Sequence, residues 1–150
     1  MRPRLYSVLG VACLAIAVVA QTGSPHSLSA HEKAERVAAW SQLPAPAALA
    51  KSVTLGPKVR LILPEGIDIP KAAAGFQDAG VFLATVHASQ NLGVPFNHLK
   101  GYMTGQEKAT LVAAIQQTRY DVDAKAEAKK ASNQARGDLE AEVETNRETP

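Results

Sequence analysis

The chain has 150 residues, of which 16 are basic and 14 acidic, so its net charge is only +2. This balance does not favour nucleic acid or an anionic membrane as a partner, because binding to either usually relies on a strongly basic surface. The single cysteine excludes an intramolecular disulfide, and the length suffices for one modest core but not for two ordinary domains.

Residues 1–20 have the features of a signal peptide. Arg2 and Arg4 make the start basic, the run 5–20 is apolar, and Val18-Val19-Ala20 ends it with small residues. We therefore expect cleavage after Ala20 and an exported protein, periplasmic or secreted. Cleavage removes two arginines and the only cysteine, which leaves 14 basic and 14 acidic side chains in the mature chain.

A retained anchor is the alternative for this segment. It needs about 20 apolar residues to cross the hydrocarbon layer, whereas the run 5–20 is shorter and contains Tyr6, Ser7 and Gly10. A lipoprotein site at Cys13 lacks the leucine expected three positions earlier. We expect no stable membrane span once the signal has been removed.

The mature chain is predicted to start with a flexible linker over 21–30, followed by a helical domain over 31–120. Its first helix is expected over 31–43, with Ala34, Val37 and Trp40 on one face, and a further helical turn over 47–51. Residues 52–70 are rich in glycine and proline. Within them, we expect the apolar piece 59–63 to be an extended segment packed across helices, since a lone strand has no partner.

The strongest signal for a core lies in 76–91, where apolar residues occur on all sides of the predicted helix, as in a buried helix. Gly93 is the expected C-cap, and Pro95 opens a second helix whose inner face carries Phe96, Leu99 and Met103. Thr104-Gly105-Gln106-Glu107 matches a capping box and predicts the start of a third helix, which continues through Leu111, Val112, Ile115 and Thr118.

Residues 121–150 predict a long alanine-rich and charged helix with a narrow apolar stripe. We expect it to be largely solvated and frayed at its distal end, because Gly137 costs about 1 kcal/mol in a helix interior. The fold class is therefore all-α: a small helical domain with an extended Gly/Pro-rich segment before the core and a long charged C-terminal helix. The stripe consists of Ala124, Ala128, Ala131, Ala135 and Leu139.

The middle of the chain resembles a family of small exported bacterial proteins of unknown function. The resemblance covers about residues 63–136. It implies export and a helical core, and it brings no activity, cofactor or catalytic residue with it. The residues that carry it are Gly75-Phe76, Gly80, Phe82, Ala84, Val86-His87, Ser89 to Phe96, Leu99-Lys100 and Met103-Thr104-Gly105.

Two binding functions are suggested by the segment 86–103. Its helix, turn and helix have the outline of a helix-turn-helix DNA reader, but Lys100 is the second helix's only lysine or arginine, so we expect no nucleic acid as partner. His87 and His98 are candidate metal ligands, yet a metal site needs more than two ligands and no further ligand is suitably spaced. We expect no cofactor, and His87 is predicted to be a core histidine bonded to a carbonyl or to Asn91.

Hydrolytic chemistry and a non-catalytic interaction role are the remaining alternatives. No Gly-x-Ser-x-Gly elbow marks a nucleophile, so we name no catalytic residue and expect binding rather than catalysis. We expect a structural or interaction role in the cell envelope, with a protein partner contacting the C-terminal helix. A small hydrolase or metal-binding protein is the alternative. The candidate residues for a functional surface are Trp40, His87, Asn91, His98 and Tyr102.

Overall fold

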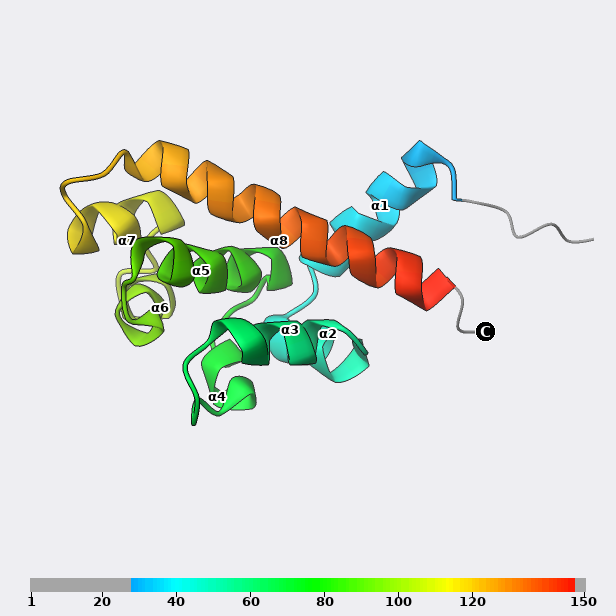
Figure 1. Ribbon diagram of the computed structural model, residues 1–150, viewed down its shortest axis with the longest axis horizontal. Helices are drawn as coiled ribbons and strands as arrows, with labels where there is room; N and C mark the ends of the chain where they lie inside the picture. Colours follow the sequence, from blue (N-terminus) through cyan, green and yellow to red (C-terminus); the bar gives the residue numbers. More distant parts are fainter. Residues whose placement is uncertain (1–27, 148–150) are drawn as a thin grey trace, which may run out of the picture.

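The computed structural model describes residues 28–147, so the predicted signal peptide and most of the linker lie outside the described residues. Over these residues the fold is all-α, as predicted, and contains no strand (Figure 1). The helices of this part of the chain are α1 (Ala30–Ser41), α2 (Ala45–Lys51), α3 (Leu55–Ile62), α4 (Ile69–Ala73), α5 (Ala79–Leu92), α6 (Phe96–Thr104), α7 (Leu111–Thr118) and α8 (Ala124–Arg147).

Helices α5 and α8 form the centre of the molecule. Figure 1 shows α8 lying lengthwise against α5, with α6 and α7 near one end of the pair and α2, α3 and α4 on the other side of α5. Every residue of α5 from Phe82 to Ser89 is buried, which confirms the prediction of a helix that is apolar on all sides. The helix starts at Ala79, three residues later than predicted, because the Asp78 side chain caps it by accepting a hydrogen bond from the Val81 N–H.

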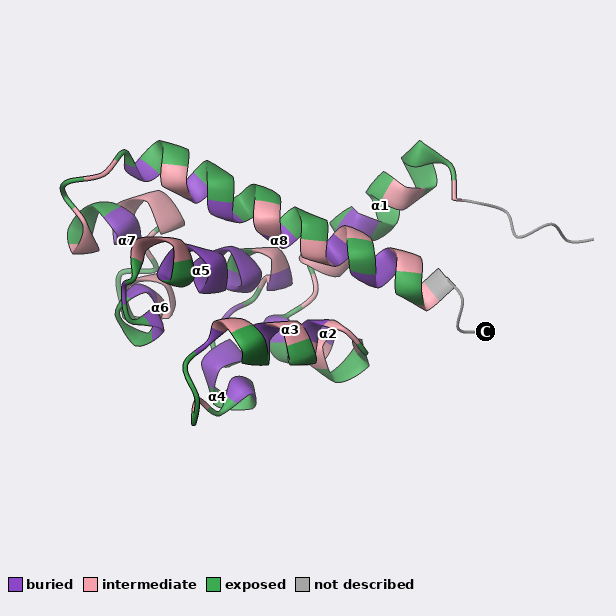
Figure 2. Ribbon diagram, in the orientation of Figure 1, coloured by how far each residue is buried: buried purple, intermediate pink, exposed green. Residues whose placement is uncertain are grey.

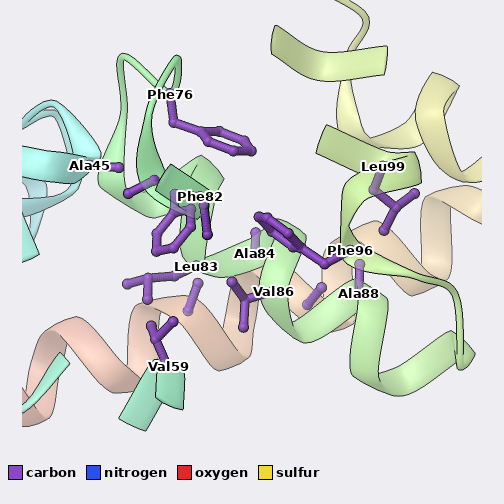
Figure 3. Packing of buried hydrophobic residues seen from close by; sticks show 14 of the residues in the cluster. Ala45, Val59, Phe76, Phe82, Leu83, Ala84, Val86, Ala88, Phe96 and Leu99 are labelled. Carbon is purple, nitrogen blue, oxygen red and sulfur yellow. The ribbon is translucent and has the colours of Figure 1, made fainter. Parts of the chain in front are cut away.

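Three phenylalanine rings form the part of the core on which α5 and α6 meet (Figure 3). The ring centroids of Phe76 and Phe82 are 5.4 Å apart, and those of Phe82 and Phe96 are 6.0 Å apart, both with edge-to-face geometry. Such pairs contribute about 0.5–1.5 kcal/mol beyond the burial of their area. The predicted inner face of α6 is confirmed for Phe96 and Leu99, which are buried, and Met103 packs against the same core.

The C-terminal helix belongs to this core. Its small side chains let it lie close to α5, and they form the buried stripe visible along α8 in Figure 2. The long helix is thus confirmed, and its outer side is exposed as expected, but its apolar stripe is buried in the core. It runs without a break through Gly137 to Arg147, because packing on α5 stabilises it, and residues 148–150 lie outside the described residues. The buried stripe comprises Ala124, Ala128, Ala131, Ala135, Leu139 and Val143.

The predicted extended segment over 59–63 is wrong, because residues 55–62 form helix α3. Pro57 lies in the first turn of that helix, where a backbone N–H has no partner within the helix and its loss costs little. The Ser52 hydroxyl accepts a hydrogen bond from the Leu55 N–H at 2.8 Å, and Leu55 and Val59, four residues apart, are both buried. Burial of the side of α3 that carries Leu55 and Val59 stabilises the helix by more than the nearby glycine and proline residues destabilise it.

The end of α6 and the start of α7 also differ from the prediction. Thr104 is the last residue of α6 and donates its hydroxyl to the Lys100 carbonyl at 2.9 Å, so it does not cap a following helix. Thr110 is the N-cap of α7, since its Oγ1 accepts from the Ala113 N–H at 3.2 Å. The C-cap at Gly93 is confirmed by its left-handed backbone, with φ 61° and ψ 28°.

Candidate functional site

A cleft of about 1030 Å³ lies between α1, α5, α8 and the loop that joins α6 to α7. We call it the α1–α8 cleft. Ligand pockets in proteins have volumes of about 300–1,000 Å³, so this cleft is large enough for a small-molecule ligand. Its two walls are the facing sides of α1 and α8, and its floor is the first turns of α5. The wall of α1 includes Ala30, Ala34, Val37 and Ala38, the wall of α8 includes Ala135, Arg136, Leu139 and Glu140, and the floor includes Gly80, Val81 and Ala84.

Helix α1 is held at its C-terminal end and stands away from the body of the molecule at its N-terminal end (Figure 1). A capping box of Ser29 and Glu32 starts the helix, and only Val37 within it is buried. At the other end, a Cβ on Gly80 would lie 3.1 Å from the Cβ of Ser41, so the glycine allows α1 to approach α5. The Ala79 N–H also donates to the Leu43 carbonyl at 2.8 Å. This attachment leaves the cleft open beside α1.

The lining of the cleft is mainly apolar and made of small side chains. Ala30, Ala34 and Ala38 follow each other at four-residue intervals, so they share one side of α1, and all three are exposed. Ala34 and Val37 both line the cleft, so they share one face of α1 as predicted, whereas Trp40 does not line it. Val81 in the floor keeps 39 % of its surface exposed. An exposed apolar surface inside a cleft is typical of a binding site.

The charged groups of the cleft lie along its rim, and most have partners. Lys33 pairs with Glu144 at 3.0 Å, Arg136 lies 4.0 Å from Glu140, and Asp78 caps α5. Lys108 has no hydrogen-bond or ion-pair partner within the described residues, and it is exposed.

The opposite flank of α8 carries a second feature, which we call the polar seam: Gln134, Asp138 and Glu142, spaced four residues apart, with their hydrogen-bond partners. Gln134 accepts from Asn91 Nδ2 at 2.7 Å. Because a helix places residues four apart on one side, the seam follows one edge of the buried stripe while Ser132, Arg136 and Glu140 follow the other edge and face the cleft. The seam therefore lies outside the cleft.

His87 and Asp138 form the central contact of the polar seam. The His87 Nε2 lies 2.7 Å from Asp138 Oδ2, and Lys58 Nζ donates to Asp138 Oδ1 at 3.0 Å. Burial raises the pKa of Asp138, but the hydrogen bonds from His87 and Lys58 together lower it by more, so the pKa lies below its usual value. The predicted partner of His87, a carbonyl or Asn91, is wrong because Asp138 reaches it from α8.

This pair lacks the geometry of a catalytic triad. The other ring nitrogen of His87, Nδ1, is buried and has no hydrogen-bond partner among the described residues, so no hydroxyl is aligned as a nucleophile there. Asp138 is itself joined to Lys58 of α3. The pair thus links α8 to α5 and α3, which is a structural role.

Glu142 is fully buried and joins α8 to the start of α3. Its carboxylate accepts hydrogen bonds from the Val53 N–H at 3.3 Å, the Thr54 N–H at 3.1 Å and the Thr54 hydroxyl, and from Asn146 Nδ2 at 2.7 Å. Burial raises the pKa of Glu142, whereas the nearby Ser52 side chain and the hydrogen bonds from Thr54 and Val53 lower it by more, so the pKa lies below its usual value. A carboxylate at a helix N-terminus is also stabilised by the helix dipole.

The five residues singled out from the sequence do not form one site. His87 and Asn91 belong to the polar seam. His98 and Tyr102, four residues apart on α6, line a separate hollow of about 590 Å³. Trp40 is half-buried against the core and does not line the cleft. Sequence analysis missed Asp138, Glu142 and the cleft, although the four-residue spacing of the polar side chains beside the alanine stripe was a usable signal.

The α5–α6 corner has the helix-turn-helix outline expected from the sequence. The side chain of Lys100 turns back to the protein and donates to the Lys71 carbonyl, and its partial burial lowers the pKa of the ammonium. Within residues 28–147, no cluster of three or more histidine, cysteine, aspartate or glutamate side chains is arranged to hold a metal ion. None of the described helices is long and apolar enough to cross a membrane.

Comparison with protein-family models, with curated proteins and with solved structures finds no match for this chain. The resemblance to small exported bacterial proteins therefore stays a prediction. The candidate site rests on the geometry of the cleft.

Proposed function

We propose that this protein is exported and has a non-catalytic binding role in the cell envelope, with the α1–α8 cleft as its binding site. The observation that carries the proposal is an apolar cleft of about 1030 Å³ that is open to solvent. Burying such a surface against a ligand is favourable by about 25 cal/mol per Å² of apolar area. The basic start and apolar run of residues 1–20 support export.

The chemistry of the site favours binding over catalysis. His87 and Glu142, which are buried, and Asp138, which is half-buried, lie in the polar seam and hold helices together. The charged groups that line the cleft stand on its rim. An active site normally places such groups inside the pocket, where burial adjusts their pKa values.

The C-terminal helix takes part in this role as a wall of the cleft. Its alanine stripe is buried against α5 and is occupied within the molecule. The surface of α8 that a partner or ligand meets is therefore the flank of Ser132, Arg136 and Glu140.

Binding to the cleft is tested with Nile red, an uncharged apolar dye whose fluorescence rises in an apolar site. We expect saturable binding of one dye per molecule of mature protein. Ala34→Trp places an indole in the cleft and should abolish binding, whereas Ala39→Trp, on the side of α1 that does not line the cleft, should leave it unchanged. Equal dye binding by the two variants, with both melting like the parent, would exclude the cleft as the site.

Export is tested separately by fractionating cells that express the full chain and measuring the mass of the protein. We expect a periplasmic or secreted species that starts at Gln21. A protein that stays in the cytoplasm with its N-terminal residues intact would contradict export but not binding to the cleft.

A further inference from the structure

We propose that the ligand of the α1–α8 cleft is a single-chain amphiphile with a carboxylate head, such as a fatty acid, whose head group pairs with Lys108. This inference rests on the proposed function and adds the chemistry of the ligand. It follows from the lining of the cleft, the charges on its rim and the backbone of Lys108.

The lining fits an alkyl chain. Small side chains from α1 leave space, and Val81, Met103 and Leu111 add larger apolar surface from the floor and from the helices beside the loop. The unbranched alkyl chain of the ligand can pack on this apolar surface between α1 and α8, because it needs no polar partners along its length. Each methylene that is buried should tighten binding about three- to fourfold, which corresponds to about 0.8 kcal/mol.

The charges on the rim select the sign of the head group. Both carboxylates that line the cleft are engaged, since Asp78 caps α5 and Glu140 lies beside Arg136. Among the cations of the cleft, Lys33 is paired with Glu144, while Lys108 has no partner within the described residues. Lys108 is therefore the charged side chain of the cleft that has no partner among the described residues, and its ammonium complements a carboxylate.

The backbone of Lys108 supports this assignment. Its φ of 44° makes it the one residue other than glycine with positive φ in the described part of the chain. A lysine in this left-handed region is uncommon and costs about 1–2 kcal/mol. The adjacent Ala109 N–H donates to the Tyr102 carbonyl at 2.9 Å, which ties the loop to α6 beside the cleft. Strained residues held by such contacts often serve binding.

The experiment measures displacement of Nile red from the mature protein by four amphiphiles kept below their micellar concentrations: laurate, octanoate, dodecanol and dodecyltrimethylammonium. We expect laurate to bind at least tenfold more tightly than dodecanol and dodecyltrimethylammonium. Octanoate should bind much more weakly than laurate, because it has four fewer methylenes.

Lys108→Asn removes the ammonium while keeping a residue that tolerates positive φ, so the loop should stay folded. It should weaken laurate binding about tenfold and leave dodecanol binding unchanged, whereas Lys108→Arg should retain tight laurate binding. Lys129→Gln, an exposed lysine of α8 outside the cleft, is the matched control and should have no effect.

The outcomes separate this inference from the proposed function. Equal binding of laurate and dodecanol, or laurate binding that is unchanged in Lys108→Asn, would overturn the carboxylate assignment while Nile red still reports binding to the cleft. Tighter binding of dodecyltrimethylammonium than of laurate would overturn it as well. A failure of the dye itself to bind would contradict the proposed function instead.

Discussion

The buried carboxylate of Glu142 provides the sharpest test of how the C-terminal helix is held. Glu142→Gln keeps the size of the side chain but removes its charge and replaces one oxygen with an amide NH₂ group. The carboxylate accepts four hydrogen bonds, two on each oxygen, from Val53, Thr54 and Asn146. Glutamine has only one side-chain oxygen, so two of the four hydrogen bonds are lost. Its NH₂ group then faces the donors that the second carboxylate oxygen had accepted from.

The expected loss of stability follows from these contacts. A hydrogen bond to a charged group contributes about 1.5–3 kcal/mol, and the relief of burying a charge offsets part of the loss. We therefore expect Glu142→Gln to lower the free energy of unfolding by about 2–4 kcal/mol. Glu140→Gln on the same helix is the control, since Glu140 is half-buried and its contact with Arg136 is long, at 4.0 Å. Its effect should stay below about 0.5 kcal/mol.

Urea unfolding followed by the fluorescence of Trp40, the only tryptophan, measures both variants. The pH dependence gives a second readout. Because the folded pKa of Glu142 lies below 4.5, its contribution to stability is complete above pH 4.5 and is lost as the pH falls through the folded pKa. The difference in the free energy of unfolding between the parent and Glu142→Gln should therefore shrink as the pH falls. If Glu142→Gln lowers the free energy of unfolding at pH 7 by less than about 0.5 kcal/mol, as obtained by linear extrapolation to zero urea, the reasoning is refuted.

Four further predictions concern the stability of the fold. Gly93→Ala should destabilise the protein by about 1–2 kcal/mol, because the residue has a φ of 61°. Gly137→Ala should stabilise the protein by about 1 kcal/mol, because no atom obstructs a Cβ at this position of α8. The urea midpoint should therefore fall in the first variant and rise in the second. Asp138→Asn should destabilise the protein near neutral pH, and calorimetry should find the loss vanishing as the pH falls below 3.8, since the folded pKa of this carboxyl is lowered. Removal of 121–150 should abolish cooperative thermal unfolding, because the buried stripe of α8 is part of the core; a dispersed NMR spectrum of the truncated chain would contradict this.

Helix ends were predicted well where the signal was local. The left-handed C-cap at Gly93 and the start of α6 after Pro95 depend on conformations that a residue adopts with its immediate neighbours. The same reasoning failed at Thr104, where the hydroxyl bonds back to Lys100. It failed at Pro57 too, since a proline tolerated in a first turn was taken as evidence against a helix.

The fold class could be predicted from the sequence, because the 3.6-residue periodicity of apolar side chains and the buried character of α5 are encoded within single helices. The role of α8 could not, because it depends on tertiary contacts. Its contacts join residues far apart along the chain, as with Asp138 and His87 or Glu142 and Thr54, and no local pattern states which distant donor a carboxylate meets. The α1–α8 cleft is likewise a product of packing, because its volume depends on how α1 is placed relative to α8 and α5.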